Sequence, residues 1–331
     1  MTEPRKIRWL IAHQPEELFL RTARAFSEQL KKLGEDSLEV EILTYPDYVA
    51  KYTSIPGLDG MVCNPDDLDK WREGRAAFWK ALADSDIEMS QMQVNSLGLM
   101  NSDFDALDLP YLFDSHEHAS RVLEGEIGET LCKELGEKSQ VTGLAFTYSG
   151  GFRVIGSVEP IMNLDDLMKS RMAVQQELAI ASALSHASPD YSFELTAPNF
   201  WHKHDPLGAN RDCDSVETTY LRFNDTSGKH ILRTNHSMFL TTIIVSNKFW
   251  SSLTEKQQAN FRTAAKEAAR IERRWSIEDA AKYEAEAESK GIQIRDLSEE
   301  DTARLRRISM HTYHKSKYHF SKDLVKKIRT S

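Results

Sequence analysis

The order of apolar and polar residues at the start of the chain predicts a strand, a helix and a second strand. Residues 7–12 form a short apolar run, which is typical of a buried parallel strand. Across residues 15–33 apolar side chains recur at helical spacing, and Gly34 follows as a natural stop. Residues 38–43 then alternate as a strand does. This succession indicates a βαβ unit and therefore a parallel sheet.

Similar patterns continue through the middle of the chain. Helical spacing predicts helices over residues 67–83 and 116–135. Residues 141–148 predict a strand that ends in a turn at Ser149-Gly150-Gly151, because Ser and Gly are typical turn residues. The β-branched run at residues 241–246 predicts another strand. We therefore expect strands and helices to alternate along most of the sequence.

The most distinctive element is a long helix in the last third of the chain. Thr254 and Gln257 have the spacing of a capping box, and residues 255–290 contain neither Pro nor Gly. Gly291 then fits a C-terminal cap. A helix of about 35 residues is roughly 50 Å long, which exceeds the size of a typical single lobe. Because its apolar positions do not keep strict heptads, we interpret it as a helix that bridges two lobes rather than a coiled coil.

Length and charge narrow the classes of protein. A chain of 331 residues exceeds what one core usually holds, so two α/β lobes are expected. The formal net charge of -9 argues against nucleic-acid binding, which needs a basic surface. No apolar run approaches the length that spans a membrane. Basic residues nevertheless gather near the C-terminus, where we interpret them as a solvated helix face: Lys315, Lys317, Lys322, Lys326, Lys327 and Arg329.

The cysteines and the N-terminus leave two questions open. Cys63, Cys132 and Cys213 have no zinc-type spacing and form no full disulfide framework, although one disulfide remains possible. Residues 1–8 are polar and carry no signal peptide. Either the protein is cytoplasmic, or the sequence begins after a signal that has been removed.

A series of short segments follows one order along nearly the whole chain. The most specific stretch is residues 107–113 (LDLPYLF), followed by His118-Ala119 and residues 123–128. The remaining segments are residues 7–15, 87–91, 150–153, 160–167, 214–220, 235–237, 249–253 and the long helix. In this order they resemble the substrate-binding proteins of tripartite ATP-independent periplasmic (TRAP) transporters, the DctP-like family.

The resemblance implies a periplasmic-binding-protein-like fold of two α/β lobes, with a ligand cleft between them and the long helix spanning both. The expected boundaries are 1–150 plus about 244–283 for lobe I, and 151–243 plus about 284–331 for lobe II. It also implies a function, which is to capture a small polar solute, expected to be an organic acid, by lobe closure in the periplasm. The implied partners are this ligand and the TRAP membrane subunits, with no nucleic acid.

Arg153 is the leading ligand-binding candidate. It follows Gly150-Gly151, where glycine lets backbone approach a ligand, and a guanidinium holds a carboxylate in a bidentate pair. The resemblance also places an Arg at this position against the ligand. The alternative is a surface Arg that closes an ion pair.

The position of the family's principal carboxylate-binding Arg is Ala173 in this chain. Arg171, two residues earlier, shares its face if the segment is a strand, but lies about 7 Å away along it. Either Arg171 takes over the role, or the usual carboxylate-binding group is absent. A second departure is the loop-like segment 199–211, in which Trp201 either covers an apolar face of the ligand or packs in the core.

Five further residues are weaker candidates. The resemblance places Glu217 near the cleft, where it either holds a metal ion bridged to the ligand or makes a structural hydrogen bond. The others are candidates for the cleft, each with the alternative of an ordinary polar residue: Thr218, Gln91, His13 and His236.

Two other functions remain open. Histidines offer metal ligands for an enzyme, either at residues 202–205 or among His311, His314 and His319, but no general base stands at a known spacing. The chain also lacks nucleophile-elbow, P-loop and dinucleotide-binding motifs, so we expect no enzyme activity. A cytoplasmic sensor or interaction protein on the same fold is the other alternative.

Overall fold

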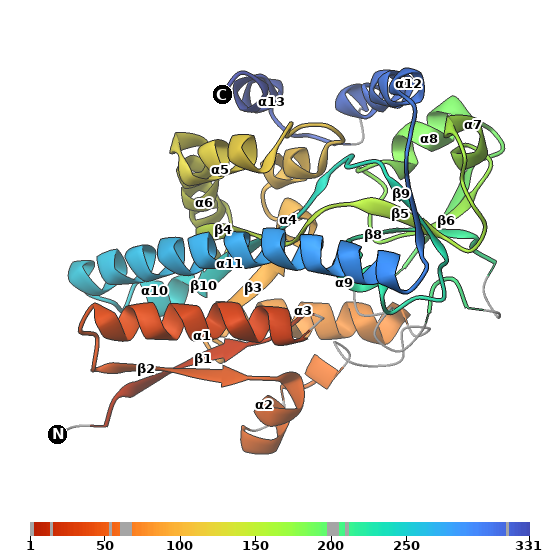
Figure 1. Ribbon diagram of the computed structural model, residues 1–331. Helices are drawn as coiled ribbons and strands as arrows, with labels where there is room; N and C mark the ends of the chain where they lie inside the picture. Colours follow the sequence, from red (N-terminus) through yellow and green to blue (C-terminus); the bar gives the residue numbers. More distant parts are fainter. Residues whose placement is uncertain are drawn as a thin grey trace. The chain divides into compact units, whose positions relative to one another are not determined.

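The computed structural model describes residues 3–13, 16–52, 55–59, 68–196, 205–208, 212–315 and 318–331 (Figure 1). They form two compact units. The first comprises Met1–Asn101, Ser120–Ser149 and Thr241–Arg274, and the second comprises Ser102–Ala119, Gly150–Leu240 and Trp275–Ser331. Residues 102–119 thus belong to the second unit, whereas the expected boundaries placed them in lobe I. The long helix divides between Arg274 and Trp275, nearer its N-terminus than expected.

The first unit is built on a five-stranded sheet in the order β2-β1-β3-β10-β4. The strand β1 (Arg5–Leu10) pairs in parallel with β2 (Leu38–Leu43) along its whole length, and also with β3 (Met89–Gln93). The strand β10 (Met238–Ser246) runs antiparallel to β3, and β4 (Val141–Phe152) forms the edge. The predicted βαβ unit is confirmed, and β10 makes the sheet mixed rather than purely parallel.

Aromatic contacts hold the helix of this βαβ unit against its sheet. The ring of Trp9 on β1 lies 5.3 Å from that of Phe26 on the first helix, and Phe26 lies 5.5 Å from Phe261 on the long helix. All three side chains are fully buried, so the apolar face of the amphipathic helix forms the core. The helices confined to this unit are α1 (Glu16–Lys32), α2 (Tyr45–Lys51), α3 (Leu68–Asp84), α4 (Val94–Gly98), α6 (Glu126–Lys138) and α10 (Asn247–Trp250).

The helix predicted over residues 116–135 is in fact two helices, α5 (His116–Glu124) and α6. Gly125 between them has an extended backbone and serves as the N-cap of α6. A Cβ atom at Gly128 would stand 2.0 Å from the Leu123 carbonyl oxygen, so the two helices meet at a point that only glycine fits. Helical periodicity continues across this break, which is why the sequence pattern did not reveal it.

The second unit is built on a six-stranded sheet in the order β11-β9-β5-β8-β6-β7. Pairing is antiparallel between β5 and each of its neighbours, and parallel elsewhere. The strands are β5 (Val154–Ser157), β6 (Arg171–Val174), β7 (Ser192–Leu195), β8 (Ser215–Thr218), β9 (His230–Arg233) and β11 (Gln293–Asp296).

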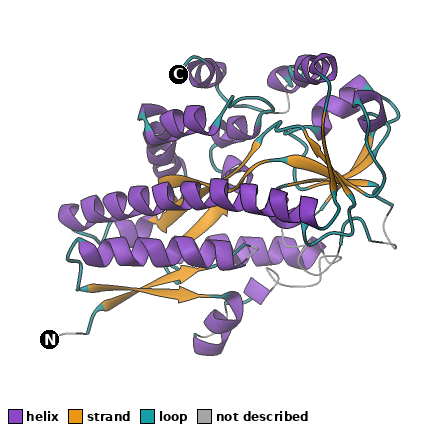
Figure 2. Ribbon diagram, viewed as in Figure 1, coloured by secondary structure: helices purple, strands orange, loops and turns teal. Residues whose placement is uncertain are grey.

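Short helices flank this sheet, and Figure 2 shows the strands as one twisted group. One apolar cluster joins Met172 and Val174 of β6 to Leu167 and Leu184 of neighbouring helices. The helices and 3-10 segments of the unit, besides the start of α5, are η2 (Ser102–Asp108), α7 (Leu164–Leu167), α8 (Ala181–Ala187), α9 (Tyr220–Phe223), α12 (Glu299–Ser309), η4 (Thr312–His314) and α13 (Lys322–Arg329).

The long helix α11 (Glu255–Ser289) forms as the sequence predicted and contributes residues to both units. The capping box is present, because Gln257 N donates to Thr254 Oγ1 at 3.2 Å and Thr254 N donates to Gln257 Oε1 at 3.0 Å. Gly291 has φ +79°, the left-handed conformation of a helix C-terminal cap.

The predicted turn at Ser149-Gly150-Gly151 is instead a continuation of β4, which ends at Phe152. All three residues have positive φ, at 48°, 121° and 75°. Within the first unit, Glu272 of α11 accepts hydrogen bonds from the backbone N–H groups of Tyr148 at 2.8 Å and Ser149 at 2.9 Å. These bonds satisfy two buried backbone donors near the end of β4.

Two further findings complete the fold. Cys132 and Cys213 are buried free thiols, and Cys63 lies outside the described residues. Within the described part of the chain, the helices are too short or too polar for any of them to cross a membrane.

A substitution of Glu272 tests whether its hydrogen bonds to the backbone of β4 stabilise the fold. Glu272→Gln should lower the free energy of unfolding by about 1–3 kcal/mol, because one buried backbone donor loses its charged acceptor. Urea denaturation followed by circular dichroism measures the change. Glu267→Gln on the same helix removes an exposed ion pair with Arg270 and should have a much smaller effect. An equal loss in both variants would contradict the role of Glu272.

Candidate functional site

Arg153 lies in the second unit between the end of β4 and the start of β5, and the conformation of Gly150 and Gly151 sets the path of the backbone that leads to it. A Cβ atom at position 150 would lie 3.0 Å from Thr219 Oγ1. The φ of +121° at Gly150 also disfavours any residue type other than glycine. The Arg153 backbone N–H donates to the Ser237 carbonyl oxygen at 2.8 Å. Arg153 is only 4% exposed, so it is not the surface residue of the alternative interpretation.

Glu217 is the buried counter-ion of Arg153. It lies on β8 opposite Ile155 of β5 and is 0% exposed. Its Oε2 accepts from Arg153 Nη1 at 3.4 Å, and its Oε1 lies 2.9 Å from His236 Nε2. The other nitrogen of His236, Nδ1, lies 2.7 Å from Thr234 Oγ1. These contacts fix the imidazole ring and give both carboxylate oxygens a partner, as a buried charge requires.

Asp108 is a second buried carboxyl group close to this network. It ends η2 and is 1% exposed. Burial raises the pKa of Asp108 to about 7, and the nearby charges of Asp105 and Glu217 add to the shift, while Arg153 and Gln176 oppose it. The carboxyl group therefore gains or loses its proton near neutral pH. We refer to Arg153, Glu217, His236 and Asp108 as the Arg153 cluster.

A second guanidinium adds positive charge beside the cluster. Arg222 is buried, and desolvation with the charge of Arg153 lowers its pKa to about 10. Both guanidinium groups lie over the ring of Phe239, with Arg153 at 4.9 Å and Arg222 at 5.7 Å from its centre. These cation–π contacts help to hold two like charges in a buried site.

Some buried polar atoms of the cluster and of its neighbours Tyr191 and Ser237 have no hydrogen-bond partner among the described residues. They are Asp108 Oδ1, Arg153 Nε, Tyr191 Oη and Ser237 Oγ. Leaving such a group unpaired costs about 1–3 kcal/mol, so each of these atoms is a candidate to bind a ligand or a water molecule. Arg153 Nε is a donor and the two hydroxyl groups are donors or acceptors. This composition suits the carboxylate and hydroxyl groups of a small polar molecule.

For Glu217 the sequence left two roles open, a metal ion bridged to the ligand and a structural hydrogen bond, and the metal role stays a prediction. Within the described ranges, no three His, Cys, Asp or Glu side chains gather as a potential metal site. The two carboxylate oxygens of Glu217 contact Arg153 and His236 instead. Of the histidines considered as enzyme ligands, residues 202 and 204 lie outside the described residues, and the ring of His311 stacks on His186.

Arg171 and Thr218 lie in the same unit but outside the cluster. The Arg171 side chain is 44% exposed and pairs with Asp212 at 3.3 Å and Glu194 at 3.7 Å. Thr218 is buried and its hydroxyl donates to the Thr219 carbonyl oxygen at 3.3 Å. Ala173 is buried on β6 beside Val216 of β8. Trp201 lies outside the described residues.

Gln91 and His13 belong to the first unit. Gln91 Nε2 lies within 3.2 Å of the hydroxyl oxygens of Thr147, Ser149 and Thr241, so this side chain ties β3 to β4 and β10. Its Oε1 has no partner among the described residues. His13 is buried, with its ring 5.5 Å from that of Phe19.

Sequence reasoning brought forward Arg153, Glu217 and His236 but missed Asp108. A signal was available, because Asp108 stands between apolar residues in the segment LDLPYLF. An acid in such a run is either exposed by a turn or buried with a specific partner. Arg222, Tyr191 and Phe239 carried no comparable signal, since their approach to Arg153 or Glu217 depends on tertiary packing.

Comparison with known proteins identifies relatives of this chain. The family model described as bacterial extracellular solute-binding protein, family 7 (DctP), matches residues 73–187 and 223–319. A solute-binding protein of Roseobacter denitrificans is 28% identical over 194 residues, which are 56% of this chain and 57% of the relative. The C4-dicarboxylate-binding periplasmic protein DctP of Rhodobacter capsulatus is 24% identical over 46% of this chain and 44% of its own. These matches span about half the length of each relative.

Solved structures extend the likeness to the whole fold. A TRAP periplasmic solute-binding protein from Ochrobactrum anthropi superimposes with a TM-score of 0.76 at 22% identity, covering 99% of this chain and 94% of the other. One from Bradyrhizobium, in complex with galacturonate, gives 0.76 at 20% identity, covering 99% and 100%. The resemblance to the TRAP substrate-binding proteins and the expected two-lobed α/β fold are thus confirmed. The chain belongs to the DctP family of bacterial extracellular solute-binding proteins, family 7.

Proposed function

We propose that this protein is an extracytoplasmic receptor that captures a small organic acid and delivers it to the membrane subunits of a TRAP transporter. Its membership of a solute-binding family supports binding rather than catalysis. The observation that carries the proposal is the buried Arg153, whose Nε has no partner among the described residues. Closure of the two lobes on the ligand is part of the proposal, since a ligand favours the state in which it makes more contacts.

The groups around Arg153 favour a hydroxylated monocarboxylate as the ligand. Arg153 supplies one guanidinium, and Ser237 and Tyr191 supply hydroxyl groups. Ala173 supplies no cation at the position of the family's principal Arg, and Arg171 is engaged with Asp212 and Glu194. Arg222 is a second guanidinium beside the cluster, but Glu217 already pairs with Arg153, so a hydroxyl-rich body matches more of the surrounding groups than a second carboxylate does. Related structures hold galacturonate in the Bradyrhizobium protein and succinate in a Shewanella oneidensis protein.

A thermal-shift screen tests the ligand class directly. The panel contains sugar acids, hydroxy monocarboxylates, dicarboxylates, keto acids, amino acids and neutral sugars, each with and without calcium. A ligand at 100 times its dissociation constant stabilises the folded protein by about 2.7 kcal/mol, which raises the melting temperature measurably. We expect the largest shift from a hydroxylated monocarboxylate. A shift only from neutral or cationic solutes would contradict the proposal of an organic acid.

Arg153→Ala should weaken binding of the acid found in that screen by at least about tenfold, since losing a charged hydrogen bond costs on the order of 1.5–3 kcal/mol. Isothermal titration calorimetry measures the affinity. Arg171→Ala is the matched control, because it removes the same charge from an exposed position outside the cluster. It should leave the affinity unchanged. Loss of binding in Arg171→Ala with full binding in Arg153→Ala would transfer the anchoring role to Arg171.

Asp108 should make the affinity depend on pH. As pH rises through about 7, the Asp108 carboxyl loses its proton at the pKa given above. The new negative charge offsets Arg153 and repels an anionic ligand, so the affinity should fall. Burial also raises the pKa of Asp105 to about 6, which adds to the fall at the lower end of the range.

Calorimetry at pH 6 and pH 8 measures this dependence in the protein and in Asp108→Asn. The variant stays uncharged at position 108, so it should bind more tightly than the unsubstituted protein at pH 8 and lose most of the pH dependence. Asp323→Asn, an exposed change on α13, is the control. An undiminished fall in affinity for Asp108→Asn would rule out Asp108 as its source.

A further inference from the structure

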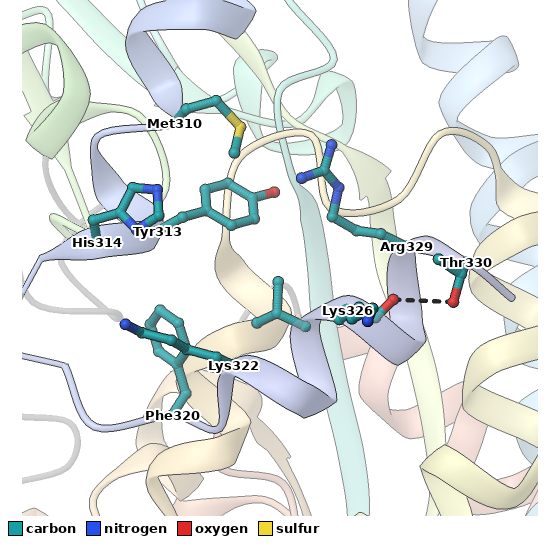
Figure 3. A pocket seen from close by; sticks show the side chains of 9 residues that line it. Met310, Tyr313, His314, Phe320, Lys322, Lys326, Arg329 and Thr330 are labelled. Atoms are coloured by element: carbon teal, nitrogen blue, oxygen red, sulfur yellow. Dashed lines mark hydrogen bonds between the residues drawn. The ribbon is translucent and has the colours of Figure 1, made fainter.

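A cavity of about 410 Å³ lies in the second unit at the C-terminal end of the chain (Figure 3). It is bounded by α13 and by residues of η4 and its surroundings, and none of its lining residues belongs to the Arg153 cluster. Its volume falls in the range of sites for small molecules, about 300–1,000 Å³. The cavity is therefore a separate feature that the proposed function does not use.

Four residues of the lining are apolar or aromatic. Tyr313, Phe320 and Val325 are buried, and Met310 lies beside them. In Figure 3 the side chains of Met310 and Tyr313 lie on one side of the space, and that of Phe320 lies on the other. The Tyr313 hydroxyl is already used, because it donates to the Pro110 carbonyl oxygen at 2.8 Å. The apolar part thus offers contact to a hydrocarbon or aromatic body rather than hydrogen bonds.

Three further residues of the lining are cationic. Lys322, Lys326 and Arg329 follow one another at spacings of four and three residues, so they share one face of α13. The three residues are exposed and make no ion pair with a described carboxylate. Asp323, the one acid of this helix, follows Lys322 directly and does not line the cavity.

Arg329 joins the two parts of the lining. Its guanidinium lies 5.6 Å from the centre of the Tyr313 ring, at cation–π distance. This contact orients the planar group at the edge of the apolar surface, where it can still pair with a carboxylate through its N–H groups. The chain as a whole has a formal net charge of -9, so the charge of this helix face is opposite in sign to the net charge of the chain. A solvated helix face, as expected from the sequence, does not account for an adjoining apolar cavity.

From this geometry we propose that the cavity is a second binding site, which takes a small organic anion with an apolar body, such as an alkyl or aryl carboxylate. The carboxylate lies among Lys322, Lys326 and Arg329, and the hydrocarbon lies against Tyr313 and Phe320. A short polar acid leaves the apolar surface uncovered, and an uncharged apolar molecule leaves the cations unpaired. Only a ligand that combines both properties uses the whole site.

Isothermal titration calorimetry of the full chain with octanoate tests the site, with octanol and acetate as matched probes. Octanol lacks the charge and acetate lacks the hydrocarbon, so both should bind at least about tenfold more weakly than octanoate. Lys326→Gln together with Arg329→Gln should weaken octanoate by at least about tenfold. Lys256→Gln, an exposed change on α11, should leave it unchanged.

Each contrary result overturns the proposal. Equal binding of octanol would show that the cations play no part, and absence of octanoate binding at millimolar concentration would show that the cavity is not such a site. Competition separates this site from the proposed solute site, because octanoate should still bind in the presence of a saturating concentration of the acid found in the thermal-shift screen. If that acid displaces octanoate while the double variant keeps binding it, the anion occupies the Arg153 cluster and the second site is refuted.

Discussion

The buried pairing of Glu217 with Arg153 and His236 is the interaction on which the second unit depends. A carboxylate and a guanidinium removed from water are costly unless each finds a partner, and here both oxygens of Glu217 are occupied. The antiparallel register of β5 and β8 places Glu217 beside the strand that follows Arg153. His236 reaches the same carboxylate from the segment before β10. The pairing thus joins three parts of the sequence at one point.

The same network supports the proposal that this part of the unit binds a solute. Pairing with Glu217 keeps Arg153 buried, yet its Nε has no partner among the described residues. When Asp108 is ionised, its negative charge offsets the positive charge of Arg153. When Asp108 is protonated, this effect is lost. The C-terminal cavity uses a different arrangement, in which the cations are exposed and the apolar surface is buried. In the proposed solute site, selectivity would derive from a preformed charge network, and in the proposed second site it would derive from the junction of charge and apolar surface.

Backbone conformation is the second constraint. Three successive residues with positive φ carry β4 from the first unit into the second, and Gly150 passes too close to Thr219 for a side chain. Within the second unit, Gly150 N donates to Ser276 Oγ of α11 at 3.2 Å. Within the first unit, Glu272 of the same helix binds the preceding two N–H groups. The backbone that leads to Arg153 is therefore fixed by hydrogen bonds to α11, to Glu272 in the first unit and to Ser276 in the second.

The sequence by itself determined the elements whose signals are local. The capping box and Gly291 set the ends of α11, and the apolar spacing of the first 43 residues set the βαβ unit, because these contacts join residues close in the chain. It also brought forward Arg153, Glu217 and His236. Only the tertiary structure decided that Arg153 is buried against a residue 64 positions away, that Asp108 titrates near neutrality, and that Arg171 remains exposed. Those properties depend on desolvation and on charges brought together by folding, which no local pattern in the sequence records.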